Sequence, residues 1–152
     1  MFGDVVMAHG IEVCFKCKCL GAPERDPQGQ FVRGADGKVI IRELGHSRDH
    51  AHCKERKICL SAVPRGFPSF FTAMHEIGHI VHPQGNYGVA KTRAVAEHNA
   101  TEWAKQECRR LGVRIRRKTI KQYDSYIKEK VERGLRRGLR VVPSEVRKYL
   151  KK

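Results

Sequence analysis

Apolar side chains recur at helical spacing between residues 68 and 83. Positions three or four residues apart fall on one flank of an α-helix, and here that flank is apolar. Its members are Phe70, Ala73, Met74, Ile77, Ile80 and Val81. Pro68 and Ser69 give a start signal, with Ser69 as the predicted N-cap, and His82-Pro83 gives the stop. The pattern predicts a helix with one flank in the core.

A second helix is predicted over residues 90–111. Arg109 and Arg110 occupy its last turn and Gly112 follows, which is typical of a helix end. The side chains expected to face inward are Ala90, Ala94, Glu97, Ala100, Thr101, Ala104, Cys108 and Leu111. Glu97 is the only charged member of this stripe.

Upstream of the first helix the pattern alternates, which is typical of strands. The predicted strands are 5–8, 11–15, 31–33, 38–42 and 57–62. Asp36-Gly37 supplies the turn chemistry for a hairpin within 31–42. Residues 1–112 are therefore expected to form an α+β domain, in which a small antiparallel or mixed sheet packs on two helices.

A basic helical extension is predicted over residues 113–152. An apolar stripe predicts a helix over about 119–133, and its members are Ile120, Tyr123, Ile127, Val131 and Leu135. Gly134 and Gly138 weaken any helix beyond it, and 144–150 can form one last short helix. The stripe implies that the extension docks either on its own domain or on a partner.

Two histidines in the first predicted helix have the spacing of metal ligands. His75 and His79 are four residues apart, so both imidazoles lie on one face about one turn apart and can meet one tetrahedral Zn²⁺. Glu76 lies roughly 100° round the helix, beside the metal rather than under it. In the HExxH pattern of zinc peptidases, a glutamate at this place is the general base.

A catalytic zinc site needs a third protein ligand, and Glu97 is the predicted one. A carboxylate in an apolar seam is costly unless a cation compensates it. The alternative for Glu97 is pairing with an arginine such as Arg93. Glu102 lies on the wetter side of its helix, and His82 is too far along its own helix to join the other two histidines.

Two segments resemble the ImmA/IrrE-type metallopeptidase family of phages and mobile elements. Residues 71–79 match its HExGH helix, and residues 97–104 are similar to its following E-x-x-A-x-x-F-A helix, with Trp103 in the aromatic position. His82 departs from the family, which commonly carries a histidine one residue later. The resemblance implies a zincin-like fold, hydrolysis of a peptide bond in a protein substrate, zinc ligands His75, His79 and Glu97, and Glu76 as the base.

An oxyanion donor is expected near the metal as well. The zinc would polarise the scissile carbonyl and its water, and Glu76 would carry the proton to the leaving amine. Tyr87 and His98 are candidates for the donor because they lie close to the ligands in sequence.

Six cysteines and several histidines suggest a second, structural zinc. Cys14 and Cys17 form a C-x2-C pair, and in a cytosolic chain such spacing favours metal over disulfides. The expected partners are two of His50, His52, Cys53 and Cys59, with the two cysteines preferred. The alternative is thiols without metal, since Cys59 falls within a predicted strand, where cysteine acts as a small hydrophobe.

Basic residues are concentrated in the extension. The 152 residues carry a net charge of +15, and residues 114–152, with 15 Lys or Arg and 4 Asp or Glu, contribute +11 of it. Clustered cations favour a polyanion such as nucleic acid, or an acidic protein partner. The simpler interpretation is a solvated surface.

No apolar run approaches the roughly 20 residues of a membrane span, and the start lacks the features of a signal peptide. We therefore expect a cytoplasmic or virion-associated protein without membrane contact. Two other functions stay open at this level. One is a non-catalytic zincin-like structural or phage virion component, and the other is a basic nucleic-acid-binding protein with a structural zinc.

Overall fold

The computed structural model describes residues 1–15, 21–23, 30, 33, 35, 41–43 and 49–150 of the chain. Within these residues the fold is α+β, as the sequence predicts. The helices are α1 (Phe2–Ala8), α2 (Phe67–Val81), α3 (Arg93–Arg110), α4 (Arg117–Arg136) and α5 (Ser144–Arg147), which a 3-10 turn, η1 (Lys148–Leu150), follows. The strands are β1 (Glu12–Phe15), β2 (Gly21–Pro23), β3 (Ile41–Glu43), β4 (His50–His52) and β5 (Lys57–Leu60).

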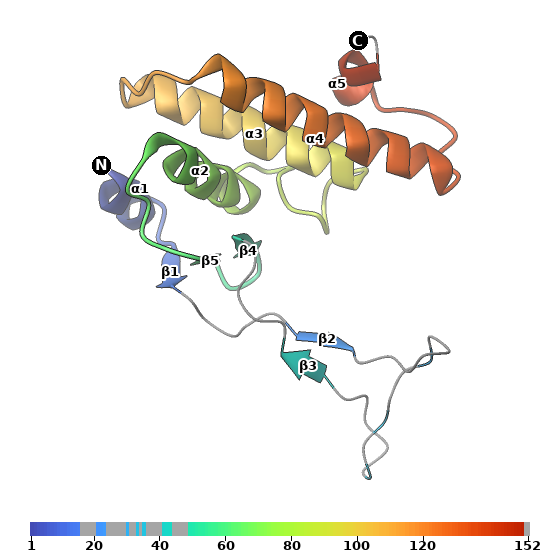
Figure 1. Ribbon diagram of the computed structural model, residues 1–152, viewed down its shortest axis with the longest axis horizontal. Helices are drawn as coiled ribbons and strands as arrows, with labels where there is room; N and C mark the ends of the chain where they lie inside the picture. Colours follow the sequence, from blue (N-terminus) through green and yellow to red (C-terminus); the bar gives the residue numbers. More distant parts are fainter. Residues whose placement is uncertain are drawn as a thin grey trace.

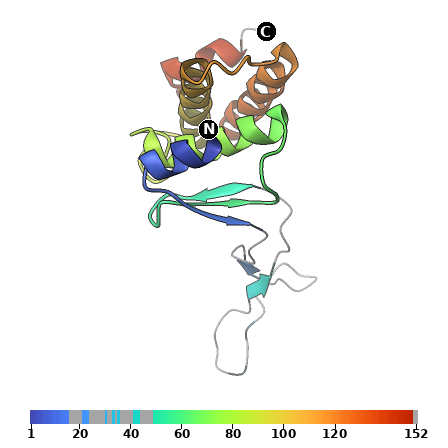
Figure 2. The same cartoon turned by 90° about the vertical axis from the view of Figure 1, so that its left-hand side faces the viewer.

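Three of the strands form a small mixed sheet in the order β1-β5-β4. The central strand β5 runs parallel to β1 and antiparallel to β4. Helices α1 and α2 cover one face of this sheet (Figure 2). Ile58 and Leu60 of β5 point to that face and share a core with Val5 of α1 and Phe71 of α2. Strands β2 and β3 form a separate antiparallel pair.

Helix α2 is the middle layer of the molecule. The sheet lies on one side of it, and α3 and α4 lie on the other (Figures 1 and 2). Gly78 allows α2 and α3 to approach closely, because a Cβ built on it would lie 2.6 Å from the Ala100 carbonyl oxygen. The close contact brings the histidines of α2 against the glutamate of α3.

The C-terminal extension docks on the rest of the chain. Helix α4 lies beside α3, and the short α5 and η1 pack on both (Figure 1). Ile127 and Val131 of α4 are buried against Val95 of α3 and Val146 of α5. Most of the predicted apolar stripe therefore faces its own chain, while its last member, Leu135, is exposed. The turn at Gly112 (φ +69°) lies at the predicted start of the extension.

Two elements differ from the prediction. Residues 5–8 belong to helix α1 instead of a strand; a short apolar run fits either, and here one side chain, Val5, enters the core. The N-cap of α2 is Gly66, three residues before the predicted Ser69. Pro68 fits within the first helical turn, where no backbone N–H is needed, and Ser69 Oγ accepts from the Gly66 N–H at 3.4 Å.

The predicted strands 11–15 and 57–62 are confirmed as β1 and β5, although each is shorter. Of the predicted hairpin, residues 41–42 lie in β3, which pairs with β2; its turn and most of its first strand lie outside the described residues. Strand β4 was not predicted, because three residues are too few to show alternation.

Candidate metal centre

Helix α2 presents His75 and His79 to α3, and their Nε2 atoms lie 3.2 Å apart. From α3, Oε2 of Glu97 lies 3.2 Å from Nε2 of His75 and 3.5 Å from Nε2 of His79. All three residues are buried, with at most 4% of their surface exposed. This group can hold a metal ion. The structure thus brings together the three side chains that the sequence singled out as ligands.

Hydrogen bonds at the far side of each imidazole determine which nitrogen faces the centre. Nδ1 of His79 lies 2.7 Å from the Gly85 carbonyl oxygen, which can only accept, so Nδ1 carries a proton. The hydroxyl of Thr101 donates to the Glu97 carbonyl at 2.7 Å and therefore accepts from Nδ1 of His75 at 3.1 Å. Both Nε2 atoms are left to face the centre, which is the arrangement that outer partners impose on metal-binding histidines.

The other carboxylate oxygen of Glu97 is held by donors from two helices and a loop. Oε1 accepts from the Tyr87 hydroxyl at 3.0 Å and from the Tyr126 hydroxyl at 2.9 Å. Nε of Arg93 lies 3.5 Å from the same oxygen. The alternative partner Arg93 therefore approaches Oε1 only, and Oε2 is directed at the two histidines.

Three electron-pair donors therefore converge where a cation fits. Burial by itself would raise the pKa of Glu97, but the two imidazoles hold it well below its usual range. Burial lowers the pKa of His75. Burial also acts to lower the pKa of His79. The nearby Glu97 and Glu76 outweigh burial, so the pKa of His79 is raised. A proton and a metal ion thus compete for the centre of this cluster, and its N, N, O donor set suits a divalent transition metal.

Glu76 borders the same centre without joining the ligand cluster. Its side chain lines a cavity of about 460 Å³ together with His75, Tyr87 and Glu97. Burial raises the pKa of Glu76 to about 8, and the negative charge of Glu97 adds to the rise. Among the described residues it has no hydrogen-bonding or ion-pair partner. A buried carboxyl group without a partner is costly, so a functional reason for it is favoured.

The cleft has walls from both sides of α2. Strand β4 supplies one wall, through Ala51 and the preceding Asp49. Helix α4 supplies the other, where the ring of Tyr123 lies 4.9 Å from that of His75. No pattern in the sequence indicated that α4 reaches the site, because contacts between segments about 50 residues apart leave no periodic signal. The roles of Gly85 and Tyr126 were missed as well, because the fold of the loop after α2 and the packing of α4 on α3 bring them to the site.

The structure separates the two candidate oxyanion donors. Tyr87 lines the cleft, and its hydroxyl lies 3.1 Å from Nε2 of His79. His98 lies on another side of α3, where Nδ1 makes a hydrogen bond of 2.9 Å to the Tyr149 hydroxyl. His98 therefore holds the C-terminal turn and is not among the residues that line the cleft.

The rival ligands also lie elsewhere. Glu102 pairs with Lys105 at 2.9 Å, and His82 accepts from the backbone N–H of Gln84 at 3.1 Å. Of the predicted cysteine set, Cys14 and Cys59 lie side by side, with their sulfur atoms 2.7 Å apart. Cys53 instead donates to the carbonyl oxygen of His79 at 3.4 Å, and Cys17 lies outside the described residues.

Comparison of the chain with protein families, with characterised proteins and with solved structures finds no match. In the described part of the chain, none of the helices is long and apolar enough to cross a bilayer. What the chain can do is therefore argued from its own geometry.

Proposed function

We propose that this protein is a zinc-dependent peptidase of zincin-like architecture, related to the ImmA/IrrE-type enzymes that it resembles. The observation that carries the proposal is the buried cluster of His75, His79 and Glu97 with Glu76 beside it in an open cleft. Two imidazoles and one carboxylate are a ligand set that catalytic zinc sites use, with a fourth position left for water.

Zinc, when bound, would acidify a water molecule and polarise a carbonyl group. Glu76 would take the proton of that water and pass it to the amine of the leaving peptide. Tyr87, which lines the cleft, would donate a hydrogen bond to the developing oxyanion by turning its one hydroxyl proton away from Glu97. Gly85 and Thr101 hold the two imidazoles in the tautomer that binding requires, and Tyr126 fixes the carboxylate of Glu97.

The state of Glu76 favours catalysis over a purely structural metal. A structural site needs only its ligands and a closed coordination sphere. A buried carboxyl group beside such a site would add cost without function. Its pKa of about 8 in the absence of metal would fall near a bound dication, which brings it into the range that suits a base at neutral pH.

The edge of the sheet suggests how a peptide would bind. In the described sheet, β4 has β5 on one side only, and His50 and Ala51 of β4 line the cleft. An extended peptide can add to such an edge through main-chain hydrogen bonds. We therefore assign substrate binding to β4, because β5 is the central strand and is already paired on both sides.

The proposal is tested by incubating the zinc-loaded protein with a mixture of unstructured peptides and identifying the products by mass spectrometry. The parent should cleave, Glu76→Gln should keep zinc but lose at least about a hundredfold in rate, and His79→Ala should lose both. Glu102→Gln, on the outer side of α3, is the matched control. Equal cleavage by the parent and by Glu76→Gln would refute the general-base role.

A polyanion contact is a second proposal. Arg117, Lys118 and Lys121 are exposed at the start of α4 and line a shallow depression, with no acidic partner among the described residues. A duplex bound there should dissociate as salt rises, since neutralised phosphates release counterions. Fluorescence anisotropy at several salt concentrations measures this. Binding that does not change with salt would exclude the contact.

A further inference from the structure

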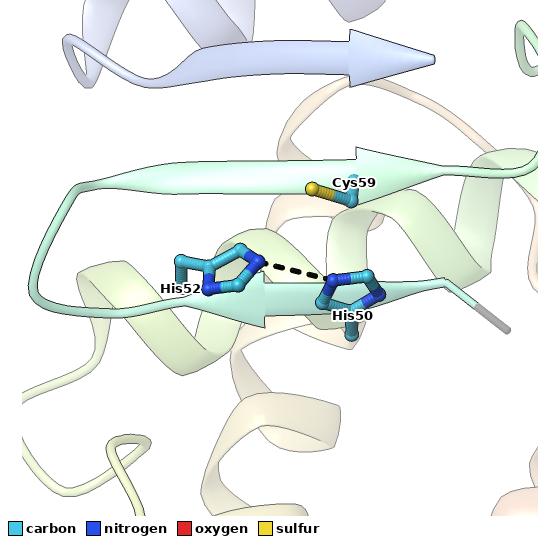
Figure 3. A group of neighbouring side chains, drawn as sticks. All are labelled: His50, His52 and Cys59. Carbon is cyan, nitrogen blue, oxygen red and sulfur yellow. Dashed lines mark hydrogen bonds between the residues drawn. The ribbon is translucent and has the colours of Figure 1, made fainter. Parts of the chain in front are cut away.

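A second cluster of metal-binding side chains lies on the three-stranded sheet. His50 and His52 of β4 and Cys59 of β5 each offer one ligand atom, and these atoms all lie within 4.8 Å of one another. Figure 3 shows the two imidazoles side by side on β4, next to the thiol of the neighbouring strand. The Nε2 atoms of the histidines are 3.1 Å apart. Two nitrogens bound to one zinc are separated by about 3.4 Å, so the spacing already suits a shared ion.

The strand register offers Cys14 as a fourth donor, although its sulfur lies outside the 4.8 Å group and would have to move toward a bound ion. Cys14 of β1 pairs with Cys59, and Cys59 pairs with His50 on its other side. Residues directly opposite each other on neighbouring strands point to the same face, and so do residues two apart on one strand. Cys14, Cys59, His50 and His52 therefore share one face. The two sulfur atoms are 2.7 Å apart and would separate to about 3.8 Å around a tetrahedral zinc.

This face of the sheet is the one away from helix α2. Ile58 and Leu60 of β5 point into the core shared with α2, so Cys59 between them points to the opposite side. Cys59 is nonetheless completely buried. The second cluster thus lies on the other face of the sheet from the His75 cluster and shares no ligands with it, although its member His50 also borders the cleft.

We propose that His50, His52, Cys59 and Cys14 bind a second, structural Zn²⁺ that ties β1, β5 and β4 together. Two imidazoles and two thiolates fill a tetrahedral zinc and leave no place for water, which is the mark of a structural site. The strands are only three or four residues long, and such short strands gain little from pairing alone. A bound ion would contribute folding free energy where the sheet is least able to supply its own.

A zinc ion at the second site would also affect peptide binding in the cleft. This step rests on the proposed peptidase function. Strand β4 carries the two histidines, and His50, Ala51 and the preceding Asp49 line the cleft beside Glu76. Zinc at the second site therefore fixes the strand on which a peptide would lie. Its loss should weaken peptide binding, seen as a raised KM, more than it lowers kcat.

Cobalt substitution tests the second site independently of the first. Co²⁺ bound to thiolate has a charge-transfer absorption that Co²⁺ bound to nitrogen and oxygen lacks. The His75 cluster contains no sulfur, so this absorption reports the second site alone. We expect the full-length chain to bind two Co²⁺ with the thiolate absorption, and the double variant His75→Ala/His79→Ala to bind one and keep it.

Substitutions then identify the ligands. Cys59→Ser should abolish the thiolate absorption with a loss of one metal per chain, and Cys14→Ser should weaken the absorption. Cys53→Ser is the matched control: it lies just after β4 but contacts His79, so the absorption should stay unchanged. Loss of the band in Cys53→Ser but not in Cys59→Ser would overturn the assignment.

The parent protein also tests the second zinc site, and this test does not depend on the folding of any variant. Zinc should slow alkylation of Cys14 at least tenfold relative to the zinc-free chain, as measured by peptide mapping. A folded parent that lacks the thiolate absorption overturns the proposal. So does a chain purified under reducing conditions in which Cys14 and Cys59 are joined by a disulfide and take up no metal.

Discussion

The hydroxyl of Tyr126 on α4 lies 2.9 Å from Oε1 of Glu97 on α3. A helix of the basic C-terminal extension thus supports a ligand of the candidate metal centre. The same oxygen also accepts from Tyr87, so Glu97 is held from two directions while its other oxygen faces the histidines. The extension is part of the site, and its removal would expose a carboxylate that is now buried.

Tyr126→Phe should weaken zinc binding by about 10- to 100-fold, because it removes one donor that orients Glu97 while keeping the ring. Tyr123→Phe is the matched control, one turn earlier on α4; its hydroxyl donates to Thr72 rather than to Glu97. Competition with a chromophoric chelator measures both affinities. Equal affinity in Tyr126→Phe and the parent would show that Tyr126 does not support the ligand.

Gly78→Ala should destabilise the protein by about 1–3 kcal/mol and weaken metal binding. The new methyl group would lie 2.6 Å from the Ala100 carbonyl oxygen and would push α2 and α3 apart. Gly3→Ala in α1, where no heavy atom lies within 4 Å of the added carbon, is the control and should not destabilise. Chemical denaturation with and without zinc measures the change. A Gly78→Ala protein as stable as Gly3→Ala would contradict the tight helix contact.

Glu76 should make the metal-free protein less stable as pH rises. Its pKa is about 8 in the folded chain, and the ordinary pKa of a glutamate side chain is 4.5, so the folded state holds more protons than the unfolded state between these pH values. The free energy of unfolding therefore falls across this window, by up to about 5 kcal/mol at 1.4 kcal/mol per pKa unit.

The measurement is urea denaturation of metal-free protein from pH 5 to pH 9. Glu76→Gln has no carboxyl group to ionise, so its stability should exceed that of the parent increasingly toward pH 8. Groups common to both proteins cancel in the difference. A difference that stays constant with pH would mean that Glu76 is not buried as a neutral acid.

Tyr87→Phe should lower kcat of the proposed peptidase by about 10- to 1,000-fold while the protein stays folded, because it removes the donor aimed at the oxyanion. It also removes one hydrogen bond to Glu97, so zinc occupancy is verified in the same sample. Tyr149→Phe is the control. It breaks the hydrogen bond to His98 at 2.9 Å and should cost about 1 kcal/mol of stability without changing kcat.

A reversed result, with kcat lost in Tyr149→Phe and kept in Tyr87→Phe, would return the catalytic role to His98. Steady-state kinetics on one cleaved peptide and thermal denaturation of the same samples separate the two outcomes.

Local patterns in the sequence were sufficient to predict the three side chains of the candidate metal centre. The spacing of His75 and His79 places them on one helix face, because helix geometry fixes that relation within four residues. Glu97 stood out as the one charge in an otherwise apolar or small stripe. The long helices were predicted for the same reason, since many periods of one pattern lie within each.

The tertiary structure decided everything that depends on separate segments meeting. Tyr126 and Gly85 gain their roles only because α4 and the loop after α2 fold against α3 and α2, and chain contacts over such separations follow from packing. The sequence alone placed His98 near the predicted metal site, but in the structure His98 makes a hydrogen bond to Tyr149. The register of β1, β5 and β4 likewise selected Cys14, Cys59 and the β4 histidines from a larger set of candidates, because only pairing across strands determines which side chains share a face.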